Sequence, residues 1–241
     1  MSVLLVSPAY PGTAYLPSRP PAGLGYLSQA LARSGQEVVF RDRGLEPSLA
    51  ALVARVREHP PRLIGISALT RCFSRHYALV RRLKRASPSS RIVLGGPHAT
   101  LYGAEIFTAC PELDLVVAGE GELALTRLAM GESPGKIPGV AEKEGDTVSL
   151  RPPEILEDLD AVAWPRYEGF PLVRYVTREL PIVSSRGCPC ACIFCPVPAT
   201  SGRKFRARSP ESLVEELRYW HGRGYREFDF VDDNFTLQKE R

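Results

Sequence analysis

Four of the six cysteines of this 241-residue chain lie within a short stretch, GCPCACIFCP. Three of them have the spacing Cys188-x3-Cys192-x2-Cys195 and directly follow the predicted strand Leu180–Ser185. Three thiolates at this spacing can each bind one iron of a [4Fe–4S] cubane, which leaves the fourth iron without a protein ligand. An open metal position is what a site needs in order to bind and activate a substrate. The cysteines therefore indicate cluster chemistry.

This pattern resembles the radical S-adenosylmethionine (SAM) enzymes. In that family three cysteines hold a [4Fe–4S] cluster, SAM chelates the fourth iron, and one-electron reduction yields a 5′-deoxyadenosyl radical. The resemblance implies that Cys188, Cys192 and Cys195 bind the cluster and that Phe194, the aromatic residue before the last cysteine, contacts SAM. It also implies an electron donor such as a flavodoxin or ferredoxin. Cys190 fits no ligand position of the pattern, and we interpret it as a bystander.

Two other uses of these cysteines compete with the cluster. A structural zinc on all four would draw ligand pairs from two separated knuckles, for which this short stretch leaves little room. A redox pair of Cys192 and Cys195 belongs at a helix start in a thioredoxin-like context. The strand–loop setting favours the cluster, and bound zinc without iron–sulfur absorbance would indicate the first alternative.

Charged residues occur at two further points near the cysteines. The resemblance places Asp232 and Asp233, after the last predicted strand, near the methionine amino group of SAM, and helix capping or turn formation is their alternative role. The basic run Gly202–Arg208 has the donors to bind an anion. A run of this kind is more commonly a solvated loop, and we interpret it in that way.

The first 135 residues alternate short apolar runs with leucine and valine at helical spacing. The runs of strand length are Val3–Ser7, Glu37–Arg41, Leu63–Ser67, Arg91–Gly96 and Asp114–Gly119. Strands that alternate with helices predict a parallel sheet covered on both faces. The predicted fold class is α/β, a flavodoxin-like doubly wound parallel sheet with its ligand beyond the carboxyl ends of the strands.

Small residues follow three of these strands at that edge. They are Ser67 and Leu69, then Gly95 and Gly96, then Gly119, Glu120 and Gly121. Glycines at strand exits let a ligand approach the backbone closely. The set resembles the cobalamin-binding domains fused ahead of radical SAM barrels, which implies that these residues line a cobalamin site. The segment after the first strand lacks histidine, so the resemblance implies cobalamin without a histidine ligand to cobalt.

Two alternatives apply to this domain. The stretch Gly23–Ser28 nearly matches a dinucleotide fingerprint and precedes Asp42 at a suitable distance, but it does not follow its strand directly and lacks the third glycine. A doubly wound domain without a ligand is the other alternative. His98 is interpreted as lying near the slot for the nucleotide tail or as a plain loop histidine.

Three segments are expected along the chain. Residues 1–135 form the cobalamin-binding-like domain, 136–179 a linker with a small hairpin, and 180–241 the start of a radical SAM barrel. The last segment has room for a strand, the helix Ser209–Gly224 and a second strand. A complete (β/α) barrel needs on the order of 200 residues. We therefore expect only the first βαβ portion of an incomplete barrel, as in the N-terminal part of a larger enzyme.

Composition narrows the class of protein further. The net charge of +4 is mild and scattered, which gives no indication of nucleic-acid binding. The first residues lack the basic region of a signal peptide, and no apolar run is long enough to span a bilayer. Six cysteines without a secretory signal favour a reducing cytoplasm.

The resemblance as a whole implies a cobalamin-dependent radical SAM protein with three cofactors, a [4Fe–4S] cluster, SAM and cobalamin. Methyl transfer to an unactivated centre of a small molecule is the leading reaction, and cyclisation or oxidative ring chemistry occurs in the same family. The sequence does not identify the substrate. The alternative from another class is a truncated, non-catalytic corrinoid- or iron–sulfur-binding remnant.

Overall fold

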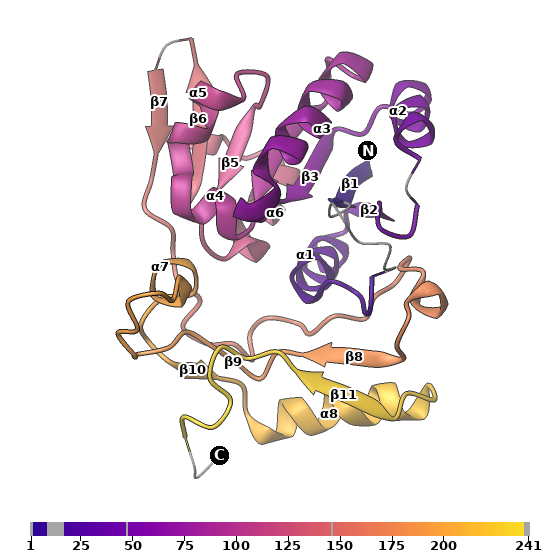
Figure 1. The fold of residues 1–241 in the computed structure, drawn as a ribbon, viewed down its shortest axis with the longest axis vertical. Helices are drawn as coiled ribbons and strands as arrows, with labels where there is room; N and C mark the ends of the chain where they lie inside the picture. Colours follow the sequence, from indigo (N-terminus) through magenta and orange to yellow (C-terminus); the bar gives the residue numbers. More distant parts are fainter. Residues whose placement is uncertain (1, 9–16, 47, 146, 239–241) are drawn as a thin grey trace.

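The computed structural model describes residues 2–8, 17–46, 48–145 and 147–238. An α/β domain forms the upper part of the molecule, and a smaller segment containing β8 to β11 lies below it (Figure 1). None of the helices in the described part of the chain is long and apolar enough to span a membrane. The loop without histidine after the first strand lies largely at residues 9–16, outside the described residues.

The sheet of the α/β domain has the strand order β2-β1-β3-β4-β5-β6-β7. Its first five strands are parallel, namely β1 (Ser2–Ser7), β2 (Glu37–Asp42), β3 (Leu63–Ser67), β4 (Arg91–Gly95) and β5 (Leu115–Val117). The order 2-1-3-4-5 confirms the predicted flavodoxin-like class. The hairpin β6 (Val140–Glu144) and β7 (Thr147–Leu150) adds two antiparallel strands to the edge formed by β5.

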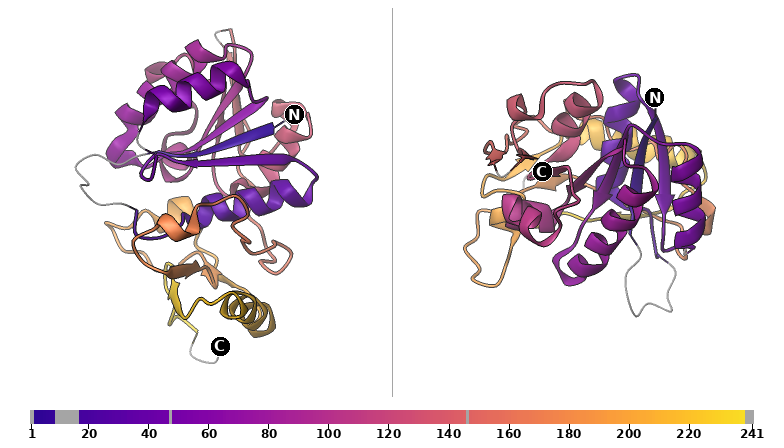
Figure 2. Two further views of the ribbon diagram at one scale, coloured as in Figure 1. Left: turned by 90° about the vertical axis from the view of Figure 1, so that its right-hand side faces the viewer. Right: turned by 90° about the horizontal axis from the view of Figure 1, so that it is seen from above.

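Helices cover both faces of this sheet (Figure 2). One face packs α1 (Ala22–Arg33) and α6 (Gly121–Ala129). The other face packs α2 (Leu49–Glu58), α3 (Phe73–Ala86), α4 (Pro97–Tyr102) and α5 (Ile106–Ala109). Short 3₁₀ turns lie at Thr70–Cys72, Gly103–Glu105, Pro134–Lys136 and Leu172–Arg174. The leucines and valines at helical spacing point inward because each helix must bury one apolar stripe.

The smaller segment contains the βαβ unit that the sequence predicts. Its strands β8 (Glu179–Ile182) and β11 (Glu227–Phe230) pair in parallel, and α8 (Pro210–Gly222) connects them. Between β8 and α8 lie β9 (Ser185–Arg186), α7 (Val197–Thr200) and β10 (Arg206–Ala207). The predicted strand Leu180–Ser185 is therefore broken after Ile182, because Ser185 turns to pair with β10.

Helix α8 begins as predicted and packs the face that contains Trp220 against the core. Ser209 Oγ accepts a hydrogen bond from Ser212 N at 3.2 Å, which caps the helix. Trp220 is buried in the apolar core that α1 and α6 also share. Glu216 is fully buried as well, whereas Leu213 and Leu217 on the same face are only partly buried. A buried ion pair of Glu216 with Arg208 accounts for this difference.

His76 on α3 predicts a pH dependence of stability. Its side chain is fully buried, and neither ring nitrogen has a hydrogen-bond partner among the described residues. Burial, with a smaller effect of nearby His98, lowers the pKa of His76 to about 4. An unfolded histidine has a pKa of about 6.5, so between these values the unfolded chain binds a proton that the folded chain does not. Stability should fall by on the order of 3 kcal/mol as the pH drops through this range.

Urea unfolding at pH 7 and pH 5 measures this effect. The variant His76→Phe should lose most of the fall in stability at pH 5, because phenylalanine has no proton to gain. The variant His221→Gln is the control, since His221 is exposed at the end of α8. A pH dependence as steep in His76→Phe as in the wild type would contradict the assignment.

Candidate functional site

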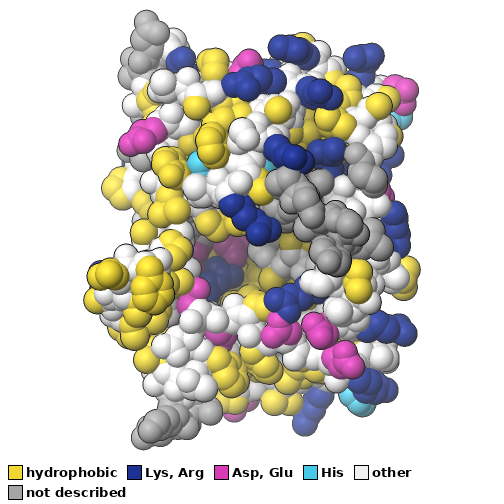
Figure 3. Space-filling model, viewed as in Figure 1, with side chains coloured by type: hydrophobic (Ala, Val, Ile, Leu, Met, Phe, Trp, Pro, Cys, Tyr) yellow, Lys and Arg dark blue, Asp and Glu magenta, His cyan; other side chains and the backbone are white. Residues whose placement is uncertain are grey.

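A cavity of about 530 Å³ lies between the α/β domain and the smaller segment. Figure 3 shows the hollow from one side, with charged side chains at its floor. The carboxyl ends of β3, β4 and β5 and the start of α6 form its upper wall. Residues between β8 and α8 form the opposite wall, namely Val183, Ser185, Arg186, Pro196, Val197, Thr200 and Ser201. A cavity of this size at the carboxyl edge of a doubly wound sheet is suited to a ligand.

The structure brings most of the predicted cobalamin-binding residues to this cavity. Those that line it are Ser67, Gly95, Gly96, Gly119, Glu120 and Gly121. Leu69 is not among the lining residues, because the chain turns into a 3₁₀ helix at Thr70. Thr100 also lines the cavity and joins two of the loops, since its Oγ1 accepts from Gly119 N at 2.9 Å and donates to Gly96 O at 3.1 Å.

Gly96 shows why glycine is needed at the exit of β4. Its φ is +89°, in the region that favours glycine. A Cβ at this position would lie 3.0 Å from Ser67 Oγ and 3.1 Å from Ala68 N. The backbones of the loops after β3 and β4 therefore pack directly against each other, and the cavity wall there is mainly backbone.

His98 has a structural position. Its ring is buried, its Nε2 lies 2.7 Å from the hydroxyl of Tyr77, and its Nδ1 lies 3.3 Å from Thr70 Oγ1. Burial lowers its pKa below the usual value. Both ring nitrogens are thus engaged within the domain. The interpretation as a plain loop histidine is wrong, because His98 lies in α4 and is buried there.

The four cysteines from Cys188 to Cys195 lie on a long hairpin, which we call the cluster hairpin. It comprises the residues between β9 and β10, from Gly187 to Phe205. Cys188 is buried at its base, Cys195 is partly buried, and Cys190 and Cys192 are exposed. Within the described ranges, no three His, Cys, Asp or Glu side chains converge into a group that could hold a metal ion. The assignment of Cys188, Cys192 and Cys195 as cluster ligands stays a prediction.

Cys188 and Cys190 differ in their electrostatic surroundings. The backbone N–H of Cys190 and then the side-chain amide of Asn234 lower the pKa of the Cys188 thiol. The hydrogen bond to Cys188 raises the pKa of Cys190. The two thiols therefore interact directly at the start of the cluster hairpin. The interpretation of Cys190 as a bystander stays a prediction.

The segment after β11 contacts the start of the cluster hairpin. Asp232 accepts from Ser184 N at 2.7 Å and from Ser185 N at 3.1 Å, and it also accepts from both serine hydroxyls. Asp233 accepts from Gly187 N at 3.3 Å and lines the cavity. The Asp232 carboxylate is therefore committed to holding the end of β8 in place. Of the two aspartates predicted to contact SAM, Asp233 is the one that lines the cavity.

Phe194, the other predicted SAM contact, lies near the tip of the cluster hairpin. Its side chain is 86% exposed, and that of the neighbouring Ile193 is fully exposed. A large apolar side chain in this position is available to a ligand or a further part of the protein. The predicted contact of Phe194 with SAM stays a prediction.

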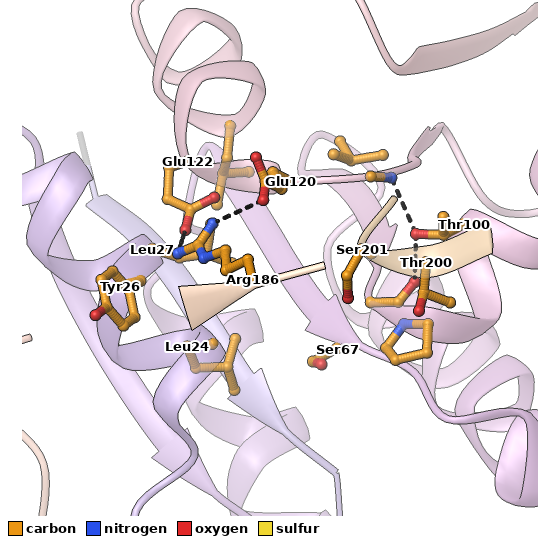
Figure 4. A pocket seen from close by; sticks show the side chains of 18 of the residues that line it. Leu24, Tyr26, Leu27, Ser67, Thr100, Glu120, Glu122, Arg186, Thr200 and Ser201 are labelled. Atoms are coloured by element: carbon orange, nitrogen blue, oxygen red, sulfur yellow. Dashed lines mark hydrogen bonds and ion pairs between the residues drawn. The ribbon is translucent and has the colours of Figure 1, made fainter. Parts of the chain in front are cut away.

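Two arginines that the sequence interpretation missed connect the walls of the cavity. Arg186 pairs with Glu120 and Glu122, and its guanidinium lies 5.0 Å from the ring centroid of Tyr26 (Figure 4). Arg206 donates to both carboxylate oxygens of Glu120 at 2.9 and 3.0 Å. Arg206 belongs to the basic run for which solvation was expected. That expectation is wrong for Arg206, whose side chain is only 2% exposed, whereas Lys204 of the same run is 64% exposed. No sequence pattern links these residues, since the partners lie in different domains.

Gly187 is expected to be essential to the shape of the cluster hairpin. Its φ is +85°, and a Cβ there would overlap the carbonyl oxygen of Lys204. Gly187→Ala should therefore cost about 1–2 kcal/mol for the backbone conformation and a further 1–3 kcal/mol for the overlap. Gly224→Ala is the matched control, since Gly224 has a φ of +89° and no atom within 4 Å of a built Cβ. Urea unfolding should show the larger loss for Gly187→Ala, and equal losses would contradict the steric argument.

Two family models match the chain. The B12 binding domain matches residues 15–129, and the Radical SAM superfamily matches residues 182–241. The first covers the strands β2 to β5 and the helices α1 to α6, and the second begins at the end of β8. The cavity lies between the two matched regions.

Curated relatives extend the match across both domains. An uncharacterized methyltransferase of Pyrococcus horikoshii is 33% identical over 232 residues, which are 92% of this chain and 50% of the relative. An anaerobic magnesium-protoporphyrin IX monomethyl ester cyclase of Synechocystis is 28% identical and covers 99% of this chain and 51% of the relative. The chain thus spans about half the length of these curated relatives.

Solved structures share the fold at lower identity. The radical SAM methyltransferase TsrM from Kitasatospora setae matches with a TM-score of 0.81 and 21% identity. The match covers 98% of this chain and 48% of the TsrM chain. The cobalamin-dependent SAM radical enzyme OxsB matches with a TM-score of 0.82 and 21% identity. The match covers 97% of this chain and 34% of the OxsB chain. The chain therefore belongs to the radical SAM proteins that carry an N-terminal B12-binding domain.

Proposed function

We propose that the chain binds a [4Fe–4S] cluster, SAM and cobalamin and serves radical-based methyl transfer to a small molecule. The observation that carries this proposal is the position of the cavity. Its upper wall is the carboxyl edge of the B12-binding domain, and its lower wall includes Pro196 and Val197, which directly follow Cys195. A ligand in the cavity is thereby in reach of both the B12-binding domain and the cluster hairpin.

Cobalamin would lie against the strand exits of the α/β domain. The strand exits line the cavity with backbone at Gly95, Gly96 and Gly119. Helix α1 lines it with the apolar side chains of Leu24 and Leu27. The lining and the volume of the cavity fit a large planar ligand whose remainder extends out of the open side. Thr100 would hold the loops after β4 and β5 at a fixed separation beside it.

The cluster would be held by Cys188, Cys192 and Cys195. Three thiols suit a cubane with one open iron, at which SAM would bind. When bound, the cluster supplies one electron to SAM and cobalamin supplies a methyl group. Asp233 would accept a hydrogen bond from the SAM amino group, because it lines the cavity and lies beside the base of the cluster hairpin.

The relatives support methyl transfer as the leading reaction and leave cyclisation as the alternative. One relative is called a methyltransferase and another a cyclase, and TsrM has a tryptophan substrate bound. An electron donor such as a flavodoxin or ferredoxin would deliver the electron to the cluster. The small-molecule substrate, this donor and a cytoplasmic location remain predictions.

Anaerobic reconstitution of the chain with iron and sulfide tests the proposal. The loaded protein should contain about four irons, absorb visible light as iron–sulfur proteins do, bind hydroxocobalamin and cleave SAM to 5′-deoxyadenosine under a strong reductant. Bound cluster and corrinoid without SAM cleavage would favour the non-catalytic alternative. Bound zinc and no cluster absorbance would overturn the cluster assignment.

A further inference from the structure

Two arginines face each other at the base of the cluster hairpin. Strands β9 and β10 are antiparallel, and Arg186 is the register partner of Arg206. Directly opposed side chains of such a pair lie on the same face of the ribbon, and like charges there are destabilising. The two side chains are 16% and 2% exposed, so water screens them weakly. The hairpin base therefore depends on negative charges supplied from elsewhere.

The B12-binding domain supplies these charges from the loop after β5 and the first turn of α6. Glu120 Oε1 lies 2.9 Å from Arg206 Nη1 and 3.3 Å from Arg186 Nη1, so one carboxylate lies between both guanidinium groups. Glu122 Oε1 accepts from Arg186 Nη2 at 2.6 Å. Glu120 is itself fixed, because its Oε2 accepts from Leu156 N at 2.8 Å.

The same ionic network borders the cavity and the cluster hairpin at once. Glu120, Glu122 and Arg186 line the cavity beside Gly119 and Gly121 (Figure 4). On the other side, Arg186 directly precedes the cluster hairpin, in which Cys188 is the first cysteine. A ligand that orders the loop after β5 holds the two glutamates in place. A cluster that orders the hairpin likewise holds the two arginines in place.

We propose that Arg186 and Arg206 are positioning residues that couple corrinoid binding in the cavity to cluster assembly on the hairpin. This inference rests on the proposed function, because the two ligands are the ones proposed there. The coupling is positive, since each ligand stabilises the paired arrangement that the other requires. By linkage, the cluster raises the affinity for corrinoid by the factor with which corrinoid raises the affinity for the cluster.

The test measures the Kd of the full chain for hydroxocobalamin before and after anaerobic loading with iron and sulfide. In the wild type the Kd should fall at least fivefold on loading, the lower end of the usual coupling range. In Glu120→Gln the two Kd values should agree within twofold, because the amide keeps the shape of the side chain and removes its charge. Arg186→Lys keeps a positive charge and should retain at least a twofold ratio.

Glu132→Gln is the matched control, since it removes a carboxylate from a partly exposed Arg–Glu pair at the end of α6. It should keep the wild-type ratio. The melting curve of Glu120→Gln shows whether this variant folds. If it does not fold, Glu122→Gln replaces it in the experiment, because this change removes a contact to Arg186 and leaves Arg206 paired. Binding of both ligands by the wild type without coupling would overturn the inference, as would full coupling in the variants. A wild type that binds neither ligand would instead overturn the proposed function and the coupling with it.

Discussion

Cys195→Ala is expected to reduce the iron bound after anaerobic reconstitution from about four atoms per chain to nearly none. A cubane with one open iron needs the other three irons held, and two thiolates would leave two irons without protein ligands. Cys188→Ala and Cys192→Ala should show the same loss. Iron analysis and the visible absorbance of the anaerobic protein measure the result directly.

Cys190→Ala is the matched control within the same hairpin. Cys190 is exposed and fits no ligand position of the cysteine pattern. This variant should therefore retain its iron and its absorbance. Loss of iron from Cys190→Ala, together with retention in one of the other three variants, would show that Cys190 is a ligand. Equal loss of zinc from all four variants would instead support the zinc alternative.

The sequence predicted the α/β domain well because its pattern is local. Most strands are short apolar runs followed by Gly or Ser, and the helices repeat their buried residues at a helical spacing. The carboxyl edge follows from the parallel order, so Gly96 and Gly119 were correctly placed together at one cavity. The direction of a single side chain is less predictable, and Leu69 turned away from the lining for that reason.

The charged network could not be predicted from the sequence. Glu120 and Arg206 are separated by 86 residues, and nothing in the local sequence of either indicates a partner. Basic residues in a loop are typically solvated, which is why the run containing Arg206 and Arg208 was interpreted as solvent-exposed. Their burial follows from docking of the smaller segment against the α/β domain, and only the three-dimensional arrangement reveals it.

Glu216→Ala is expected to destabilise the protein by about 3–5 kcal/mol, because it leaves a buried guanidinium without a counter-charge. The side chains of Arg208 and Glu216 are each 1% exposed and form an ion pair between the residue that follows β10 and the middle of α8. Arg208 also donates to Val183 O at 3.2 Å and to Ser212 Oγ at 2.9 Å. These neutral acceptors would remain in the variant, but they do not replace the missing carboxylate charge.

The electrostatics of Glu216 indicate how this effect can be separated from simple loss of packing. Burial raises the pKa of Glu216 in spite of the attraction to Arg208, so desolvation of the carboxylate outweighs its pairing. Replacing both partners with apolar residues should then cost much less than the sum of the single changes. The double variant Arg208→Met/Glu216→Leu should show a coupling energy of at least about 2 kcal/mol in a urea-unfolding cycle with Arg208→Met and Glu216→Leu.

The exposed pair of Lys204 and Glu157 provides the control for this cycle. Both side chains are 64% exposed, so Glu157→Ala should change the unfolding free energy by less than about 1 kcal/mol. A cost below about 1 kcal/mol for Glu216→Ala, or strictly additive losses in the cycle, would show that Arg208 reaches water. In that case the packing of α8 would depend on Trp220 and its aromatic neighbours such as Tyr167, and the ion pair would contribute little to it.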